Sequence, residues 1–463
     1  MSERVVVIGA DAAGMSAASQ AKRMRGDDLE VTVLERGSHT SYSACGIPYW
    51  IAGDVGSVDD LVARTAEEHR ANGIDLRMRN EAVGIDMDRR EVEVRELDGS
   101  GADSSRGSTY RLGFDHLVIA TGARPRRPEV PGIDADGVLG VQTLDDGERF
   151  LDALQSRRPQ RAVVVGGGYI GIEMAEAMVT RGLSVTVVTR SPEPMATLDP
   201  DMGRQVHEAM EGMGIDVRTG AVIEAVETSA DGWARAVVTD AGEFAADLVV
   251  LGTGVSPETE LASSAGLPVG RWGGLVTDLQ MRVFDAEGVW AAGDCVESID
   301  LVSGNRVHVA LGTHANKQGR VLGTNLGGGY ATFPGVVGTA VSKVCELEIA
   351  RTGLKEKDCD AVGFAYLTVR VDSTTRAGYY PGAQPVTVKL VVEQRTGRLL
   401  GAQIVGREGS AKRIDTLAVA LWNHMTVEEI SALDLGYAPP FSPVWDPVLI
   451  AARKAADKVR AGS

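Results

Sequence analysis

The chain has 463 residues, of which 44% are hydrophobic and 24% are charged, and its formal net charge is -17. This length predicts about three domains whose cores are large enough to fold without disulfide bonds. The negative charge repels phosphates, which excludes nucleic acid and an anionic membrane surface as expected partners. No run of about 18 apolar residues predicts a transmembrane helix, and Asp11 and several glycines interrupt the apolar N-terminus, unlike in a signal peptide. We therefore expect a cytoplasmic protein.

The N-terminal segment predicts a nucleotide-binding unit built from a strand, a glycine turn and a helix. Residues 4–8 form an apolar run typical of a buried parallel strand, and the turn GADAAG follows. Gly9 permits the tight turn and Gly14 permits close packing of the helix, whose N-terminus then faces a pyrophosphate. Glu35 ends the second strand, where an acid holds a ribose hydroxyl. Asp11 replaces the usual middle glycine, so its carboxylate must point away from a pyrophosphate.

The same pattern recurs in residues 161–190 with a complete turn, GGGYIG. The three glycines of this turn are Gly166, Gly168 and Gly171. The strand after the helix ends in Thr189 and Arg190, with no acid where Glu35 stands in the first unit. A missing acid and an arginine favour the 2′-phosphate of NADPH over NADH, although Arg190 is also compatible with a plain surface charge. Two dinucleotide sites in one chain imply two cofactors that exchange electrons.

The remaining sequence completes an α/β architecture with a different C-terminal part. Apolar strands that end in small residues close the two units at 116–125 and 248–257. The Gly/Ser-rich stretch 98–108 is expected to form the tip of a hairpin. From about residue 335, alternating strands appear and helices are expected at 410–423 and 426–433. This pattern is typical of an α+β domain with antiparallel strands.

These motifs together resemble the two-dinucleotide-binding flavoproteins of the pyridine nucleotide-disulfide oxidoreductase family, over essentially the whole chain. The resemblance implies two Rossmann-like domains, one for FAD and one for NAD(P)H, and a C-terminal α+β dimerisation domain, hence a homodimer. The expected domains are the FAD-binding domain at 1–145 and 275–330, the NAD(P)H-binding domain at 146–274 and the dimerisation domain at 335–463. The cofactor contacts implied are Gly9, Ala12, Gly14, Glu35, Ala120, Thr121, Gly122, Gly166, Gly168, Ile170, Gly171, Thr189, Arg190, Gly254, Gly293, Asp294 and Ala310, of which Asp294 is expected on the ribitol of FAD.

The segment SYSACGIPYW, residues 41–50, carries the expected catalytic cysteine, Cys45. Common disulfide reductases of the family have a second cysteine five positions later, where this chain has Trp50, and their C-terminal His–Glu signature is also missing. The chain therefore resembles the single-cysteine branch: coenzyme A-disulfide reductases, persulfide reductases, NADH oxidases and NADH peroxidases. Oxidases and peroxidases carry a histidine where this chain has Ala12, which leaves disulfide or persulfide reduction ahead. The other three cysteines are expected to be buried or idle thiols.

A thiolate is the form of cysteine that attacks a disulfide. Pro48 fits the first turn of a helix, and we expect the N-terminus of that helix to lower the pKa of Cys45. In the expected cycle, NADPH reduces FAD, the flavin breaks a mixed disulfide at Cys45, and the freed thiolate attacks the next substrate. By resemblance, Tyr437 of the partner subunit protonates the leaving thiol. Tyr379 and Tyr380 fit a second tyrosine element equally well, and interface packing is the alternative role of all three.

The resemblance also implies contacts with coenzyme A at Gln20, Arg23 and Ser41. Ala44 stands where the coenzyme A site has an asparagine, a departure from the pattern. Cations at the end of a helix also suit its dipole, so a structural role of Arg23 stays open. The leading hypothesis is an NAD(P)H-dependent reductase of a small disulfide or persulfide. The alternatives are an NAD(P)H oxidase and a redox-sensing or electron-transfer flavoprotein.

Overall fold

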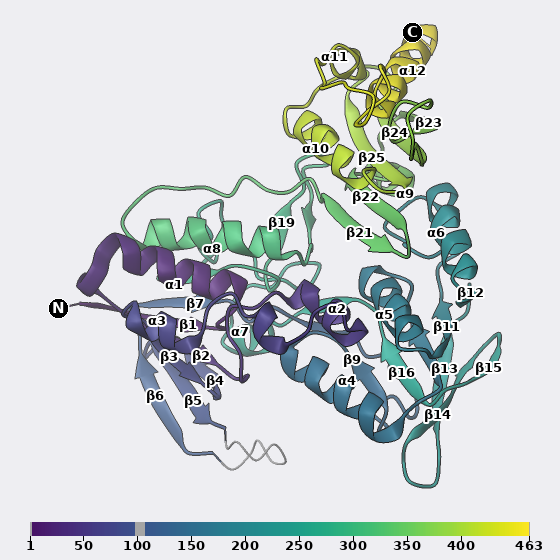
Figure 1. Ribbon diagram of the computed structural model, residues 1–463. Coiled ribbons are helices and arrows are strands. Elements are labelled where there is room, and N and C mark those ends of the chain that lie inside the picture. The colour runs from purple at the N-terminus through teal and green to yellow at the C-terminus, as the bar shows by residue number, and fades with distance from the viewer. Residues whose placement is uncertain (1, 98–106, 463) are drawn as a thin grey trace.

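The computed structural model describes residues 2–97 and 107–462, so most of the stretch 98–108 lies outside the described residues. Three five-stranded sheets dominate this part of the chain, two of them parallel and one antiparallel (Figure 1). The predicted α/β fold class, with two Rossmann-like units followed by a C-terminal α+β domain, is confirmed.

The first parallel sheet takes four strands from the N-terminal part of the chain and one from much later. In order across the sheet they are β18 (Val289–Ala291), β7 (His116–Ile119), β1 (Glu3–Ile8), β2 (Leu29–Glu35) and β3 (Asp75–Met78). Helix α1 (Ala12–Arg25) connects β1 to β2 and packs along α8 (Gly312–Leu326). The neighbouring strands β1 and β7 are near-continuous apolar runs, as expected where both faces of a parallel sheet are covered.

The second parallel sheet repeats this construction. Its strands, in order, are β12 (Asp216–Thr219), β11 (Ser184–Thr189), β10 (Arg161–Val165), β16 (Leu248–Leu251) and β9 (Val138–Gly140). Its helices are α4 (Leu144–Arg157), α5 (Tyr169–Thr180) and α6 (Pro200–Gly212). The short helix α2 (Ile47–Ala52) begins two residues after Cys45 and packs against α4 and α5. Residues 41–46, which precede α2, are called the Cys45 segment below. The Cys45 segment therefore lies where the two nucleotide-binding units meet.

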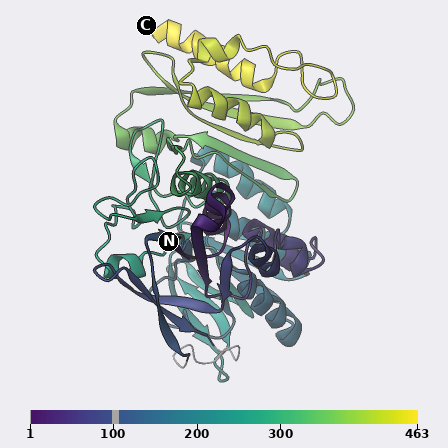
Figure 2. The same cartoon turned by 90° about the vertical axis from the view of Figure 1, so that its left-hand side faces the viewer.

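The antiparallel sheet belongs to the C-terminal domain, at one end of the molecule in Figures 1 and 2. Its order is β21 (Ala340–Val344), β22 (Leu347–Gly353), β25 (Leu399–Gly406), β24 (Pro385–Glu393) and β23 (Tyr366–Thr374). The helices are α9 (Glu356–Val362), α10 (Ile414–Trp422), α11 (Val427–Ser431) and α12 (Pro447–Gly462). The two helices expected at 410–423 and 426–433 are present in shorter form, whereas α12 was not predicted.

Smaller elements complete the described chain. Two three-stranded sheets comprise β4 (Asn80–Asp86), β5 (Glu91–Glu96) and β6 (Thr109–Gly113), and β13 (Ile223–Thr228), β14 (Ala234–Thr239) and β15 (Gly242–Ala245). Two-stranded pairs are β8 (Ala123–Pro125) with β17 (Val255–Pro257) and β19 (Ser298–Ile299) with β20 (Arg306–Val307). The short helices are α3 (Ala66–Ala71) and α7 (Glu260–Ser264). None of the described helices is both long and apolar enough to cross a membrane.

Candidate active site

The first glycine turn brings backbone atoms too close for any side chain. Gly9 has a φ of 105°, and a Cβ there would lie 2.2 Å from the Ala120 carbonyl oxygen. A Cβ at Gly14 would lie 1.9 Å from the Gly9 carbonyl oxygen, so only glycine lets α1 approach the strand this closely. Glu35 completes this turn, because its carboxylate accepts hydrogen bonds from the Ala10 and Gly37 amides at 2.9 and 2.7 Å. Burial raises the pKa of Glu35.

Two more acids border this turn. Asp11 points toward the Cys45 segment and accepts a hydrogen bond from the Tyr42 amide at 3.3 Å. Burial, and then the neighbouring Glu35 charge, raises its pKa to about 6. Burial also raises the pKa of Asp294 to about 6, and the Asp294 carboxylate has no hydrogen-bond partner within residues 2–97 and 107–462. An unpartnered, partly buried carboxylate beside a backbone turn fits FAD, whose ribityl chain offers hydroxyl donors and whose pyrophosphate needs amide donors.

The other residues expected at the FAD are placed around the same turn. Ala12 is the first residue of α1, and the Thr121 hydroxyl donates to the Glu258 carbonyl at 2.5 Å. Gly122 has a φ of 73° with open space beside it. A Cβ at Gly293 would lie 2.8 Å from the Ala13 Cβ, so the turn before Asp294 packs directly on α1. Ala310 is partly buried just before α8.

The second glycine turn repeats the geometry of the first. A Cβ at Gly166 would lie 2.2 Å from the Gly252 carbonyl oxygen, and one at Gly171 would lie 1.9 Å from the Gly166 carbonyl oxygen. No atom lies within 4 Å of a Cβ built at Gly168, so this side of the turn is open for a nucleotide. Ile170, in the first turn of α5, is partly buried, and Gly254 is exposed with a φ of 84°. The residues present fit a dinucleotide pyrophosphate at the N-terminus of α5.

Thr189 and Arg190 follow at the carboxyl end of the neighbouring strand, β11. Thr189 is buried, whereas Arg190 is exposed and has no ion-pair partner in the part of the chain that the structure describes. An unpaired guanidinium at this edge of the sheet is available to a phosphate.

Cys45 lies in a 3₁₀ turn, Ala44–Gly46, and its thiol is exposed. The turn is fixed by the Gly46 amide, which donates to the Ser43 carbonyl at 2.8 Å, and by Leu61, which a Cβ at Gly46 would approach to 2.3 Å. Trp50, at the position of the absent second cysteine, is 8% exposed. A Cβ on Gly147 would meet its indole at 2.6 Å, so Trp50 is a packing residue.

The prediction that the pKa of Cys45 is lowered is wrong, because the surrounding protein groups raise this pKa. Although Cys45 is exposed, protein atoms around its sulfur displace part of the surrounding water, and this desolvation raises the pKa of the thiol. The negative charges of Glu173 and Asp294 raise it further. Pro48 does lie in the first turn of α2, as expected, but that helix has only six residues. Its dipole is outweighed because desolvation and nearby carboxylates both disfavour a thiolate. The sequence did not predict the effect of Glu173 on Cys45, because the two residues come close only when α2 packs on α5.

The remaining cysteines do not offer a second redox partner. All four cysteines are free. Cys295 and Cys359 are buried, and the Cys295 thiol is 3.4 Å from the Ile119 carbonyl oxygen. Cys345, between β21 and β22, contacts the sulfur of Met213, which directly follows α6. The structure therefore leaves Cys45 as the one exposed thiol among the described residues.

Of the three residues expected at coenzyme A, Gln20 and Arg23 lie in the second half of α1, and Ser41 lies four residues before Cys45. The Gln20 amide donates to Thr324 at 3.2 Å and its oxygen accepts from Arg23 at 3.1 Å. The neighbouring cations Lys22 and Arg25 form ion pairs with Asp27 and Glu3, respectively. Arg23 is exposed and makes no ion pair within the described ranges. Of the three cations Lys22, Arg23 and Arg25, it is therefore the one available to an anion.

Ser41 has a partner that the sequence gave no signal for. Its hydroxyl lies 2.9 Å from Nε2 of His69, which is buried and whose Nδ1 has no hydrogen-bond partner among the residues that the structure describes. Ser41 has a φ of 49°, a conformation unusual for a residue with a side chain. The bond to His69 therefore fixes the backbone four residues before Cys45.

The three candidate tyrosines lie on the C-terminal domain rather than beside Cys45 of the same chain. Tyr437 is in the segment between α11 and α12, which Figure 1 shows at the end of the molecule away from α2. Tyr437 is 48% exposed and Tyr379 is 78% exposed. A side-chain hydrogen bond with Tyr379 raises the pKa of Tyr437. Other exposed apolar side chains of this domain are Val419, Trp422, Phe441, Val444 and Trp445, and an apolar surface of this kind is typical of a protein interface.

Comparison with known proteins places this architecture in a family. The model of the pyridine nucleotide-disulphide oxidoreductases matches residues 3–319, and the model of their dimerisation domain matches residues 339–447. This chain belongs to the pyridine nucleotide-disulphide oxidoreductase family. It is an FAD-dependent oxidoreductase that uses a pyridine nucleotide, and its last domain is a dimerisation domain.

Relatives of this chain are named for several different activities. A protein of Pyrococcus horikoshii called NAD(P)H coenzyme A polysulfide/persulfide reductase is 38% identical, with 98% of each chain covered. A protein of Methanocaldococcus jannaschii called NADH oxidase is 35% identical, with 98% of this chain and 99% of that protein covered. Among solved structures, an NAD-dependent persulfide reductase from A. fulgidus is 39% identical with a TM-score of 0.94, covering 99% of this chain and 84% of that one.

Two further structures form an instructive pair. The water-forming NADH oxidase of Lactobacillus brevis bound to NADH is 26% identical with a TM-score of 0.92. An engineered form of it, described as an NADPH oxidase and bound to NADPH, is 27% identical with the same TM-score. Each comparison covers 99% of both chains.

Removing the charge of Glu173 tests whether this carboxylate raises the pKa of Cys45. In Glu173→Gln, a charge that raises the thiol pKa is removed, while the hydrogen bond from Ser342, now 2.8 Å long, can still form. The pKa therefore falls, and we expect iodoacetamide to alkylate Cys45 faster at neutral pH, with the pH profile displaced to lower pH. Glu176→Gln on the same helix, whose charge is not among those that raise the pKa of Cys45, is the matched control. Alkylation is followed at Cys45 itself by peptide mass spectrometry, because Glu176 raises the pKa of Cys345. An unchanged Cys45 profile in Glu173→Gln would contradict the assignment.

Proposed function

We propose that this protein is an NADPH-dependent reductase of a small disulfide or persulfide, with coenzyme A disulfide as the first substrate to test. The observation that carries this proposal is the exposed Cys45, which has no cysteine partner. Its segment contacts the first glycine turn through the Ser41 amide and the second unit through α2. The relatives named as coenzyme A-dependent sulfur and persulfide reductases support it.

The chemistry at Cys45 begins with its thiolate. The thiolate attacks one sulfur of the substrate disulfide, forms a mixed disulfide and releases the other half as a thiolate. FAD, held at the first glycine turn with Asp294 beside its ribityl chain, would supply the two electrons that come from NADPH. Two-electron reduction of the mixed disulfide releases the second thiol and frees Cys45. NADPH, one proton and one disulfide thus give NADP⁺ and two thiols. The raised pKa of Cys45 favours its protonated or disulfide-bonded form between these steps.

We assign the coenzyme A half of the substrate to the C-terminal end of α1 and to the segment before Cys45. Arg23, exposed and without an ion pair within the described ranges, offers a cation to a phosphate. Gln20 orients Arg23 through their 3.1 Å hydrogen bond. Ser41, whose hydroxyl contacts His69, lies four residues before Cys45, and we propose that it contacts the thiol arm of the same ligand.

Cys45→Ser tests the central role of the thiol. We expect the variant to keep bound FAD and its reduction by NADPH, but to lose NADPH oxidation that depends on coenzyme A disulfide. The measurement is NADPH absorbance with and without substrate, with Cys345→Ser as the control for removing a cysteine. Oxygen consumption in the presence of NADPH, measured with an oxygen electrode, tests the alternative hypothesis of an oxidase. Disulfide reduction that survives in Cys45→Ser would sink the mechanism.

The leaving thiolate needs a proton, and Tyr437 is proposed to supply it across the dimer. The position of Tyr437 supports this arrangement: it lies on the dimerisation domain between α11 and α12, helices that Figure 1 shows away from α2, which begins two residues after Cys45. General acids contribute about 10²- to 10⁴-fold to a rate, so Tyr437→Phe is expected to lower kcat by such a factor. Tyr379 and Tyr380 are the neighbouring candidates for the same role.

Mixed dimers test whether the tyrosine acts between subunits. Cys45→Ser and Tyr437→Phe homodimers are each expected to be nearly inactive. In a mixed dimer, one site combines both intact residues and the other combines both changes, so about half of the wild-type rate per dimer should return. Tagged co-expression and purification of the mixed dimer give the measurement. No recovery would place the proton donor in the same chain as Cys45.

The preference for NADPH is proposed from the end of β11. The engineered oxidase carries a glycine-to-alanine exchange, and 18 positions later three consecutive exchanges of aspartate, alanine and methionine to alanine, arginine and serine. In this chain Gly171 lies 18 positions before Thr189, and Thr189, Arg190 and Ser191 stand at the corresponding positions. The chain thus has no acid there and has an arginine followed by serine, as in the form bound to NADPH.

Arg190→Ala is expected to raise the KM for NADPH about tenfold, the loss of one charge-assisted hydrogen bond. The KM for NADH, which lacks the 2′-phosphate, should stay unchanged and serves as the internal control. A fifth exchange in the engineered oxidase, proline to arginine, corresponds by the same spacing to Ala196. Ala196→Arg should therefore lower the KM for NADPH. Equal effects of Arg190→Ala on both nucleotides would refute the assignment.

A further inference from the structure

The segment that follows Arg190 is a buried, tightly held loop. Residues 190–199, here called the nucleotide loop, connect β11 to α6. Arg190 is exposed at its start, but Met195, Leu198 and Asp199 are all buried. A loop with this much buried side chain has a fixed conformation even though it is not regular secondary structure.

Part of this fixation comes from the nucleotide domain itself. The Met195 amide donates to the Gly167 carbonyl at 2.6 Å, which ties the loop to the second glycine turn. The buried carboxylate of Glu193 lies 2.5 Å from the Arg204 guanidinium and 2.7 Å from Nδ1 of His207, both on α6. The loop is therefore held at the turn that faces the pyrophosphate and at the helix that follows.

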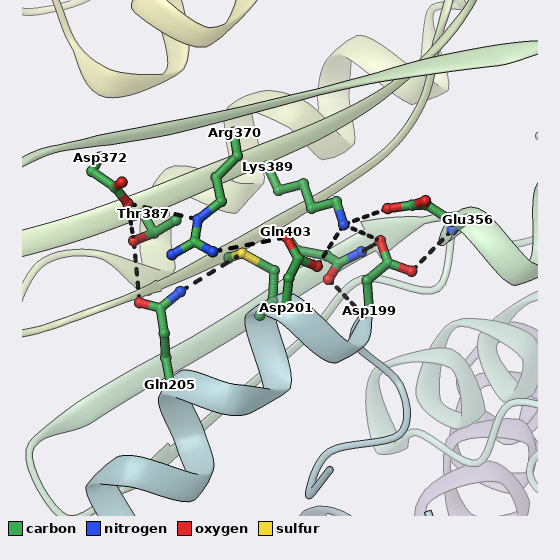
Figure 3. A network of polar contacts seen from close by, with 10 residues as sticks. Asp199, Asp201, Gln205, Glu356, Arg370, Asp372, Thr387, Lys389 and Gln403 are labelled. Carbon is green, nitrogen blue, oxygen red and sulfur yellow. Dashed lines mark hydrogen bonds and ion pairs between the residues drawn. The ribbon is translucent and has the colours of Figure 1, made fainter. Parts of the chain in front are cut away.

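The rest of the fixation comes from the dimerisation domain (Figure 3). Gln403 on β25 makes two hydrogen bonds with Asp199: it accepts from the Asp199 amide at 2.8 Å and donates to the Asp199 carboxylate at 2.7 Å. The Glu356 amide donates to the other Asp199 oxygen at 3.1 Å. The Lys355 ammonium donates to the Ala196 carbonyl. These bonds join the far end of the nucleotide loop to a different domain.

Lys389, on β24, is the centre of this contact. It is 3% exposed, and its ammonium lies 3.1, 2.6 and 2.5 Å from carboxylate oxygens of Asp199, Asp201 and Glu356. Burial alone would lower the pKa of Lys389, but the bonds to Asp201 and Glu356 and the Asp199 charge outweigh burial and raise it. The three acids are close enough together to hold a metal ion, but the ammonium already takes the position of the cation.

We propose that the dimerisation domain positions the nucleotide loop for recognition of the 2′-phosphate, with Lys389 and Lys355 as positioning residues. This inference rests on the proposed recognition of NADPH by Arg190. Arg190 gains affinity for a phosphate only if its backbone is already in place, because ordering the loop on binding would offset the new ion pair. The dimerisation domain thus contributes to nucleotide specificity through contacts that lie outside the nucleotide site.

Lys355→Met and Lys389→Met test this role by steady-state kinetics on the FAD-loaded dimer. We expect Lys355→Met to raise the KM for NADPH about threefold to tenfold, with the KM for NADH and kcat nearly unchanged. Lys389→Met should have the larger effect, and hydrogen exchange in residues 190–199 should accelerate. Lys412→Met, which removes a surface lysine paired with Asp415 on the same domain, is the control. If Lys389→Met does not fold, Lys355→Met decides alone.

The outcomes separate the two levels of the proposal. An Arg190→Ala variant with an unchanged KM for NADPH would overturn the recognition of the phosphate and the positioning role with it. If Arg190→Ala raises that KM while folded lysine variants leave the ratio of the NADPH and NADH KM values unchanged, only the positioning role fails. A raised ratio in Lys355→Met, together with an unchanged ratio in Lys412→Met, supports it.

Discussion

A thiol surrounded by acids is the constraint on which this site depends. After burial itself, Glu173, Asp294 and Asp11 all raise the pKa of Cys45. A further negative charge on the sulfur is therefore unfavourable among the protein's own groups. A mixed disulfide at Cys45 carries no charge, so the site favours the bonded sulfur between turnovers. The same acids repel a departing thiolate, which makes a nearby proton donor necessary for its release and gives an external tyrosine a clear task.

The two nucleotide-binding units bring strand and helix together in the same way, and they differ at the middle of the turn, Asp11 against Gly168, and at the strand end. In both units, the first glycine of the turn has a positive φ, and a second glycine lies at the start of the helix. At each of these positions a neighbouring backbone oxygen lies so close that a Cβ atom would clash with it. The amides at each helix N-terminus then suit a pyrophosphate. The identity of the nucleotide is decided elsewhere, at the strand end. Glu35 is locked by two backbone amides, whereas Arg190 is exposed and unpaired within the described chain.

The features read correctly from the sequence are those that depend on neighbours along the chain. The glycine turns span six residues each, and the single thiol in its segment is visible without any fold. The features that were missed join distant positions. Glu173 reaches Cys45 only after α2 packs on α5, so the sequence led to the wrong direction for the thiol pKa. The pairing of Ser41 with His69 and of Asp199 with Gln403 likewise depends on tertiary contacts. In VTVKLVVE the alternation identifies a strand, but it does not show that Lys389 is buried.

The choice of a lysine at the junction of two domains has a physical rationale beyond stability. Buried ion pairs contribute little net stability, because removing the charges from water offsets their attraction. Hydrogen bonds with charged groups nevertheless have fixed lengths and directions. An apolar contact between α6 and the sheet would allow small sliding motions, whereas the bonds from Lys389 and Gln403 to Asp199 allow one position. Because Asp199 ends the nucleotide loop, a defined junction between domains becomes a defined position for Arg190 at the other end of the same ten residues.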